Sequence, residues 1–149
     1  MERMTDSGRI VAISISTRKG VPKTNVPEAW LVEDWGIEGD AHAGKWSRQV
    51  SLLAVESIDK MRSRGLAVGP GAFAENITTQ YLAISRLAVG TRIRIGGAEL
   101  ELTQIGKECH ARCAIFQATG DCVMPKEGIF ARVVAGGLIR VGDPVQVVE

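Results

Sequence analysis

The 149-residue chain has an ordinary globular composition, with 45% apolar and 23% charged residues and a formal net charge of +1. This length suits one domain, residues 1–149, and the near-neutral charge argues against nucleic acid or a membrane as a partner. The sequence has no apolar run of membrane-spanning length, no secretion signal and only three cysteines, so we expect a cytoplasmic protein with free thiols.

The first half of the chain mostly predicts short strands joined by loops. Residues 9–16 alternate, which predicts a strand with Val11, Ile13 and Ile15 on one face. Glycines interrupt residues 36–46, so this stretch is expected to be a loop. Further strands are expected at residues 29–35, at residues 49–54 and around Ile77.

Residues 55–65 are the best candidate for a helix. Their apolar side chains recur at near-helical spacing, Glu56 and Lys60 could pair one turn apart, and Gly65 is a natural stop. A second short helix is predicted at residues 125–137, with its apolar side chains on one face and Pro125 near its start.

The clearest local structure is a hairpin over residues 91–102. Two alternating runs flank Gly96 and Gly97, which is a two-residue turn signal. Folding there puts the apolar side chains on one face, and a slip of one residue would break the pattern. The expected cross-strand ion pairs are Arg94 with Glu99 and Arg92 with Glu101.

The end of the chain predicts two strands around Gly142, Asp143 and Pro144. In total the sequence indicates about seven or eight short strands and two short helices. A regular βαβ alternation is missing from the sequence, which argues against a parallel doubly wound sheet. The predicted fold is therefore mainly β, a β-barrel with a few peripheral short helices.

The stretch "IGKECHARCAIF" places Cys109, His110 and Cys113 within five positions. Zinc or an iron–sulfur cluster accepts these ligand types, but the spacing is unlike the paired knuckles of structural zinc sites. Cys113 and Cys122 could equally be small buried residues. Cys109 is the candidate reactive thiol, because the nearby cations Lys107 and Arg112 favour its thiolate form.

Other polar residues stand in segments that could hold a ligand. Asp40 and His42 lie in the glycine-rich loop, where Lys45 and Arg48 could meet an anion. The alternative is that Asp40 caps a turn and His42 is structural. Asn76 could bind a polar ligand or satisfy buried backbone groups.

Arg132 belongs to the predicted second helix, in the apolar stretch "GIFARVV". A lone arginine in such a helix usually points outward and extends to solvent. If it points inward, it needs an anion from the protein or from a ligand.

The order of the motifs resembles that of a small bacterial MOSC domain protein over about residues 8–148. MOSC denotes the C-terminal domain of molybdenum cofactor sulfurase. The resemblance implies a barrel of the pyruvate-kinase type with added helices, and binding of the molybdenum cofactor (molybdopterin) or its pterin precursor. The motifs are, in chain order, "GIEGDAHAGKW", "QVSLLA", "GAFAENITT", "LAVGTRIRIG", "IGKECHARC" and "CVMPKEGIFARVVAGG".

The resemblance also implies roles for single residues. Cys109 matches the family's key cysteine, which ligates molybdenum in amidoxime-reducing relatives and is associated with sulfur transfer in the sulfurase. Asn76 matches an asparagine near the pterin in larger relatives. A ligand with a terminal phosphate needs cations around it, and we expect two or three of the candidates to take part. These candidates are Lys45, Arg48, Lys107, Arg112 and Arg132.

Three functions remain open at this stage. The first is a cofactor-binding sulfur carrier, which needs a cysteine desulfurase or other sulfur donor and a molybdoenzyme acceptor. The second is a molybdenum-dependent reductase of N-hydroxylated compounds with an electron-donor partner, and the third is a non-catalytic cofactor-delivery module. Pyridoxal phosphate enters only at family level, through the sulfurase's desulfurase domain, which we do not expect in this chain. A homodimer is compatible with all three.

Overall fold

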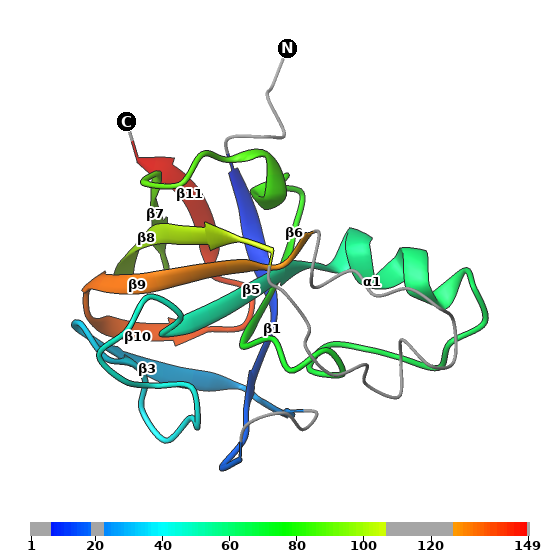
Figure 1. The fold of residues 1–149 in the computed structure, drawn as a ribbon, viewed down its shortest axis with the longest axis horizontal. Helices are drawn as coiled ribbons and strands as arrows, with labels where there is room; N and C mark the ends of the chain where they lie inside the picture. Colours follow the sequence, from blue (N-terminus) through cyan, green and yellow to red (C-terminus); the bar gives the residue numbers. More distant parts are fainter. Residues whose placement is uncertain (1–6, 19–22, 107–126, 149) are drawn as a thin grey trace.

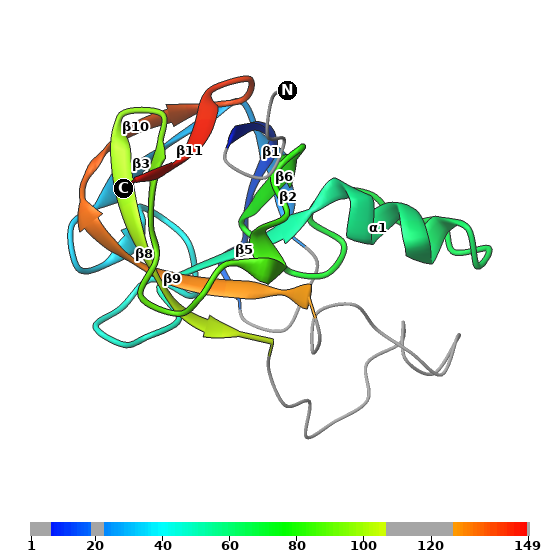
Figure 2. The same ribbon diagram turned by 90° about the horizontal axis from the view of Figure 1, so that it is seen from above.

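The structure is a computed structural model, and it describes residues 7–18, 23–106 and 127–148. Seven strands close into a barrel in which each strand pairs with the next and the last pairs with the first (Figures 1 and 2). In order around the barrel they are β1 (Ser7–Ile15), β6 (Ile77–Gln80), β5 (Val50–Ala54), β9 (Ile129–Ala135), β8 (Ala98–Ile105), β7 (Arg92–Ile95) and β11 (Pro144–Val148).

The remaining elements surround the barrel. Strand β2 (Thr24–Val26) pairs antiparallel with the end of β1. A second small sheet has the order β10 (Gly137–Arg140), β3 (Glu28–Val32) and β4 (Gly36–Ile37). Figure 2 shows helix α1 (Val55–Arg62) outside the ring of strands. The 3-10 turn η1 (Ile84–Arg86) precedes β7. The predicted mainly-β barrel is confirmed, although the described residues contain more strands and fewer helices than expected.

Two apolar clusters hold the fold together. The larger fills the barrel with inward-facing side chains such as Ile13, Leu52 and Leu100, all fully buried. Because successive strand residues point to opposite faces, Leu53 on β5 faces outward and packs beneath α1. There it joins a second cluster with Ile58, Met61, Phe73 and Phe130. Strand β5 therefore buries apolar side chains on both of its faces.

The predicted hairpin has the expected register, with Ile93 opposite Leu100. Its ion pairs differ from the prediction. Arg92 forms its ion pair with Glu99 diagonally, at 3.5 Å, and Glu101 pairs with Arg132 of β9 at 2.7 Å. Long side chains can reach diagonal and next-strand partners, so register alone does not decide which charges meet.

The predicted face of the first strand is partly wrong. A register irregularity between Ile10 and Ala12 in the pairing of β1 with β6 disturbs the alternation. Ile10, Ala12 and Ile13 are buried, whereas Val11 is only half-buried. An extra residue in one strand reverses the facing of the residues that follow it.

The predicted second helix is wrong over its described part, because Ile129–Ala135 is strand β9. This strand lies between β5 and β8 and carries a run of buried residues, Ile129 to Ala131. A short continuous apolar run fits a buried strand as well as a helix, and its partners decide between them. Arg132 is therefore a strand residue.

Helix α1 confirms the first helix prediction. It has no side-chain N-cap, and Gly65 adopts a left-handed conformation at φ 92° just beyond its end. Lys60 forms its ion pair with Glu127 at 2.9 Å, while Glu56 accepts the backbone N–H of Tyr81. In the described part of the chain, no helix has the length and apolar character needed to span a membrane.

The two C-terminal strands form where they are predicted, but they do not pair with each other. Strand β10 pairs with β3 in the small sheet, whereas β11 pairs with β7 and β1 in the barrel. The Gly142 turn between them therefore carries the chain from one sheet to the other. This is how the barrel closes after the small sheet has been completed.

Candidate functional site

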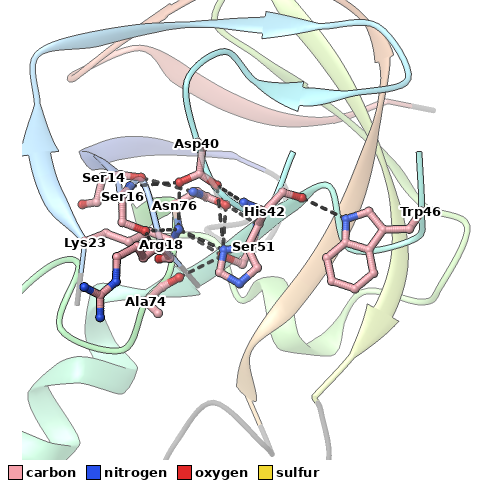
Figure 3. Close-up of polar contacts among 10 residues, drawn as sticks. All are labelled: Ser14, Ser16, Arg18, Lys23, Asp40, His42, Trp46, Ser51, Ala74 and Asn76. Carbon is pink, nitrogen blue, oxygen red and sulfur yellow. Dashed lines mark hydrogen bonds and ion pairs between the residues drawn. The ribbon is translucent and has the colours of Figure 1, made fainter. Parts of the chain in front are cut away.

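A buried ion pair lies at the centre of the candidate site. Lys23 Nζ is 2.7 Å from Asp40 Oδ1, and both side chains are fully buried. Lys23 directly precedes β2, and Asp40 lies in the loop after β4 (Figure 3). The same ammonium group donates to Ser16 Oγ at 3.1 Å and contacts His42 Nδ1 at 3.0 Å. The ammonium group of Lys23 therefore links the segment before β2 to the residue just after β1 and to the loop after β4.

Asp40 is held as a carboxylate by this environment. Burial raises the pKa of Asp40, but the hydrogen bond from Lys23 and the backbone N–H of Ser16 lower it, and so does the charge of Lys23. These contributions outweigh burial, so the pKa lies below its ordinary value. The other carboxylate oxygen accepts the backbone N–H of His42 at 3.0 Å.

The contact with Lys23 fixes the protonation pattern of His42. An ammonium group has only donors, so the Nδ1 atom that it contacts must accept the hydrogen bond. The proton of the neutral ring is then on Nε2. The side chain of His42 is 21% exposed, unlike the buried Lys23 and Asp40. The buried pair therefore presents an oriented imidazole whose Nε2–H is the donor.

We expect the neutral His42 ring to be the Nε2–H tautomer. Long-range ¹H–¹⁵N spectra of the ring near pH 7.5 check this, with a His110→Asn variant to separate the two histidines. Lys23→Met should change the tautomer balance of His42, because Nδ1 then loses its donor. An Nδ1–H tautomer in the wild type would contradict the assigned direction of the Lys23 hydrogen bond.

Asn76 connects three strands behind the ion pair. Its Oδ1 accepts the backbone N–H and the hydroxyl of Ser51 at 2.9 and 3.2 Å, and its Nδ2 donates to the carbonyl of Ser14 at 3.2 Å. Asn76 is fully buried, and it also contributes to the lowered pKa of Asp40. Its described contacts are those of a positioning residue, and direct contact with a cofactor stays a prediction.

Glu75 next to it is fully buried as well. Its carboxyl group accepts the backbone N–H groups of Gly71 and Phe73 and the hydroxyl of Thr78, at 2.9 to 3.2 Å. Burial raises the pKa of Glu75 above its ordinary value, against the opposing effect of these hydrogen bonds. This residue holds the turn before β6 and does not join the contacts of Lys23.

The other predicted cofactor-binding residues are placed differently. Lys45 is exposed on the loop. The guanidinium of Arg48 lies over the rings of Trp46 and Phe130, at 5.6 and 5.5 Å from their centroids. Arg132 pairs with Glu101 on the neighbouring strand and so already has an acidic partner. The structure therefore brings together Asp40, His42 and Asn76, with Arg48 on the same loop.

Strand β8, which precedes the cysteine-containing segment in the sequence, contacts this loop near its end. Predicted residues Cys109, Lys107 and Arg112 lie outside the described residues. On either side of them, the backbone N–H of Gly106 donates to the carbonyl of Gly128 at 2.6 Å. Thr103, near the end of β8, donates its hydroxyl to the carbonyl of Ser47 on the loop. Within the described ranges, no group of three histidine, cysteine, aspartate or glutamate side chains could hold a metal ion.

Lys23 is the residue that sequence reasoning missed. It appears in the sequence as one of several cations in a loop rich in glycine and proline, where a lysine is normally solvated. Its partner Asp40 is 17 positions away, with strands between them. The sequence contains no periodic signal for such a pairing. The ion pair is seen only in the folded structure, where the two segments lie together.

Comparisons with known proteins identify the family and support the fold. A family model described as the MOSC domain matches residues 39–146. The solved YUAD protein from Bacillus subtilis superposes with a TM-score of 0.79 at 18% identity, covering 95% of each chain. YiiM from Escherichia coli gives 0.66 at 23% identity, covering 95% of this chain and 70% of that one.

A further solved structure, YiiM from Geobacillus stearothermophilus, gives a TM-score of 0.70 at 21% identity, over 95% of this chain and 75% of that one. At these identities the three structures show a shared fold. The search of curated proteins found no match.

Proposed function

The chain belongs to the MOSC domain family, and we propose that it binds the molybdenum cofactor or its pterin precursor and carries sulfur through Cys109. The family is associated with binding of the molybdenum cofactor. The observation that supports the proposal here is the Lys23–Asp40–His42 arrangement. Its members Asp40 and His42 lie on the loop that the end of β8 contacts. Cys109 follows that strand, three residues after Gly106 in the sequence.

The described residues fit such a ligand in kind. A pterin with a terminal phosphate offers hydrogen-bonding edges and negative charge, which call for oriented donors and cations. His42 supplies an oriented ring donor, and Arg48 and Lys45 supply charge from the same loop. When bound, the molybdenum would supply redox chemistry or a position that accepts sulfur.

The described donors do not form a metal site by themselves. In the cofactor the pterin sulfurs would hold the metal, and a soft thiolate is the natural protein ligand beside them. Cys109 is the thiol that we assign to this position.

The chain's own residues would divide the remaining work. The buried Lys23 and Asp40 set the orientation of His42, and Asn76 fixes the strands behind them. A Cys109 thiolate would attack the terminal sulfur of a donor persulfide, so that a new S–S bond forms while the donor's S–S bond breaks. The donor leaves as a thiolate, and no electrons are gained or lost overall. A cysteine desulfurase fits as the donor and a molybdoenzyme as the acceptor.

Cofactor retention tests this proposal directly. Purified chain is mixed with released molybdenum cofactor, free ligand is removed, and bound pterin and molybdenum are quantified for the wild type, Cys109→Ser and Cys113→Ser. We expect the wild type and Cys113→Ser to retain both, and Cys109→Ser to retain pterin with little molybdenum. Absence of pterin from the wild type would refute cofactor binding.

Sulfur handling is tested separately by incubating the chain with a persulfide donor and measuring persulfide by mass spectrometry. The expected mass increase is one sulfur atom on Cys109, and it should be absent from Cys109→Ser. Wild type that retains the cofactor but never carries sulfur would leave the reductase alternative, whose measurement is reduction of an N-hydroxylated base with an added electron donor.

A further inference from the structure

Arg48 has no hydrogen-bonding or acidic partner in the part of the chain that the structure describes. Among the described barrel residues, Arg132 pairs with Glu101 and Arg92 with Glu99. Arg9 donates instead to the side-chain oxygen of Gln80. Arg48 is half-buried and has no hydrogen-bond acceptor or acidic partner among residues 7–18, 23–106 and 127–148. A half-buried guanidinium without an anion is unusual, because its desolvated donors need acceptors.

Two aromatic rings hold Arg48 in place instead. Its guanidinium carbon lies 5.6 Å from the Trp46 centroid and 5.5 Å from the Phe130 centroid. Contacts with ring faces stabilise the cation but use none of its N–H donors, which lie in the guanidinium plane. The donors are therefore left for a planar, two-point contact with an oxyanion.

Both rings are themselves anchored. The Trp46 indole N–H donates to the carbonyl of His42 at 2.9 Å, as Figure 3 shows. Phe130 is only 4% exposed and belongs to the cluster beneath α1. Because the rings restrict the arginine before any ligand arrives, less conformational entropy is lost on binding. Through its indole hydrogen bond, Trp46 also links Arg48 to the backbone of His42, the residue whose side chain Lys23 and Asp40 orient.

We propose that Arg48, held between Trp46 and Phe130, is the subsite for a phosphate group of the ligand. The negative charge of Asp40 at the centre of the site is already neutralised by Lys23, and Lys45 on the same loop as Arg48 adds a second cation. Two positive charges favour a doubly charged phosphate over a singly charged carboxylate. The identity of the whole ligand rests on the function proposed above, whereas the subsite rests on the contacts of Arg48.

Binding of inorganic phosphate to the full-length chain tests the subsite without the cofactor. Trp46 is a built-in reporter once Trp30 and Trp35 are replaced by Phe, and calorimetry provides a second measurement. We expect a dissociation constant on the order of 1 mM that weakens with added salt, and weaker binding of acetate. Arg48→Gln should weaken phosphate binding at least about tenfold, and Arg48→Lys should also weaken it, because lysine lacks the planar fork.

Arg92→Gln is the matched control, since it removes the same charge from a side chain that pairs with Glu99 outside the site. It should bind phosphate like the wild type. Equal binding by wild type and Arg48→Gln overturns the subsite, and so does a parallel loss in Arg92→Gln, which would show a general charge effect.

The outcomes separate the two proposals. If the wild type and Arg48→Gln retain equal amounts of pterin, the subsite fails while cofactor binding stands. If phosphate binds through Arg48 but the wild type retains no pterin, cofactor binding fails and the subsite stands for another phosphorylated ligand.

Discussion

Lys23→Met should lower the free energy of unfolding by about 3–5 kcal/mol at pH 7, because it leaves the buried Asp40 carboxylate without its cation. That loss is a large share of the roughly 5–15 kcal/mol that stabilises a typical domain. Chemical denaturation monitored by circular dichroism measures it. Lys45→Met is the matched control, since the same substitution at an exposed lysine on the neighbouring loop should change stability by no more than about 0.5 kcal/mol.

The pH dependence identifies the cause of this loss. In the wild type the pKa of Asp40 is below its ordinary 3.8, so the ion pair stabilises the fold above that pH and is lost as pH falls through the folded pKa. Without Lys23, burial dominates and raises the pKa, so the variant loses stability as pH rises above 3.8. His42, the other titratable side chain near the carboxylate at 3.9 Å, is present in both proteins. The two proteins should therefore differ least near pH 3 and most at neutral pH.

A second variant tests whether the unpaired charge is responsible. Lys23→Met combined with Asp40→Asn removes both charges and should recover at least about 1 kcal/mol relative to Lys23→Met alone. A Lys23→Met protein within 1 kcal/mol of the wild type at pH 7 would contradict the buried ion pair. So would a difference that does not change with pH.

Asn76→Ala should lower stability by about 3 kcal/mol, with a fall in melting temperature of roughly 10 °C. The substitution leaves the buried N–H of Ser51 without its acceptor and removes the link between Ser51 and the carbonyl of Ser14. A buried donor without a partner loses its hydration and gains nothing in return. Thermal unfolding followed by calorimetry gives the comparison.

Gln80→Ala is the control for this variant. Gln80 accepts one exposed hydrogen bond, from the side chain of Arg9, so its loss should change stability by less than about 1 kcal/mol. Similar melting temperatures for Asn76→Ala and the wild type would contradict the structural role of the Asn76 network.

Much of the fold could be predicted from local patterns. The hairpin has the predicted register because Gly96 and Gly97 form a tight turn and the flanking runs alternate on both sides of it. Helix α1 ends near Gly65, which takes the left-handed conformation that glycine favours. The sequence predicts a helix over strand β9 because its short apolar run fits a helix face as well as a buried strand, and only pairing with β5 and β8 assigns it.

The candidate site was predictable only in part. Asp40, His42 and Asn76 are candidates from the sequence that lie close together, whereas Arg132 pairs with Glu101. The burial of Lys23 and the position of Arg48 between two rings gave no signal in the sequence. These features depend on which distant segments close around a side chain.

The sequence by itself determined the mainly-β class, the central hairpin, the first helix and the family resemblance, because turns and periodicity act over a few residues and the motifs keep their order along the chain. Only the tertiary structure decided the register of β1, the strand at Ile129–Ala135, the charge partners and the burial of Lys23. Each of these is set by contacts between segments far apart in the chain, where the partner supplies the burial, the hydrogen bond or the opposite charge.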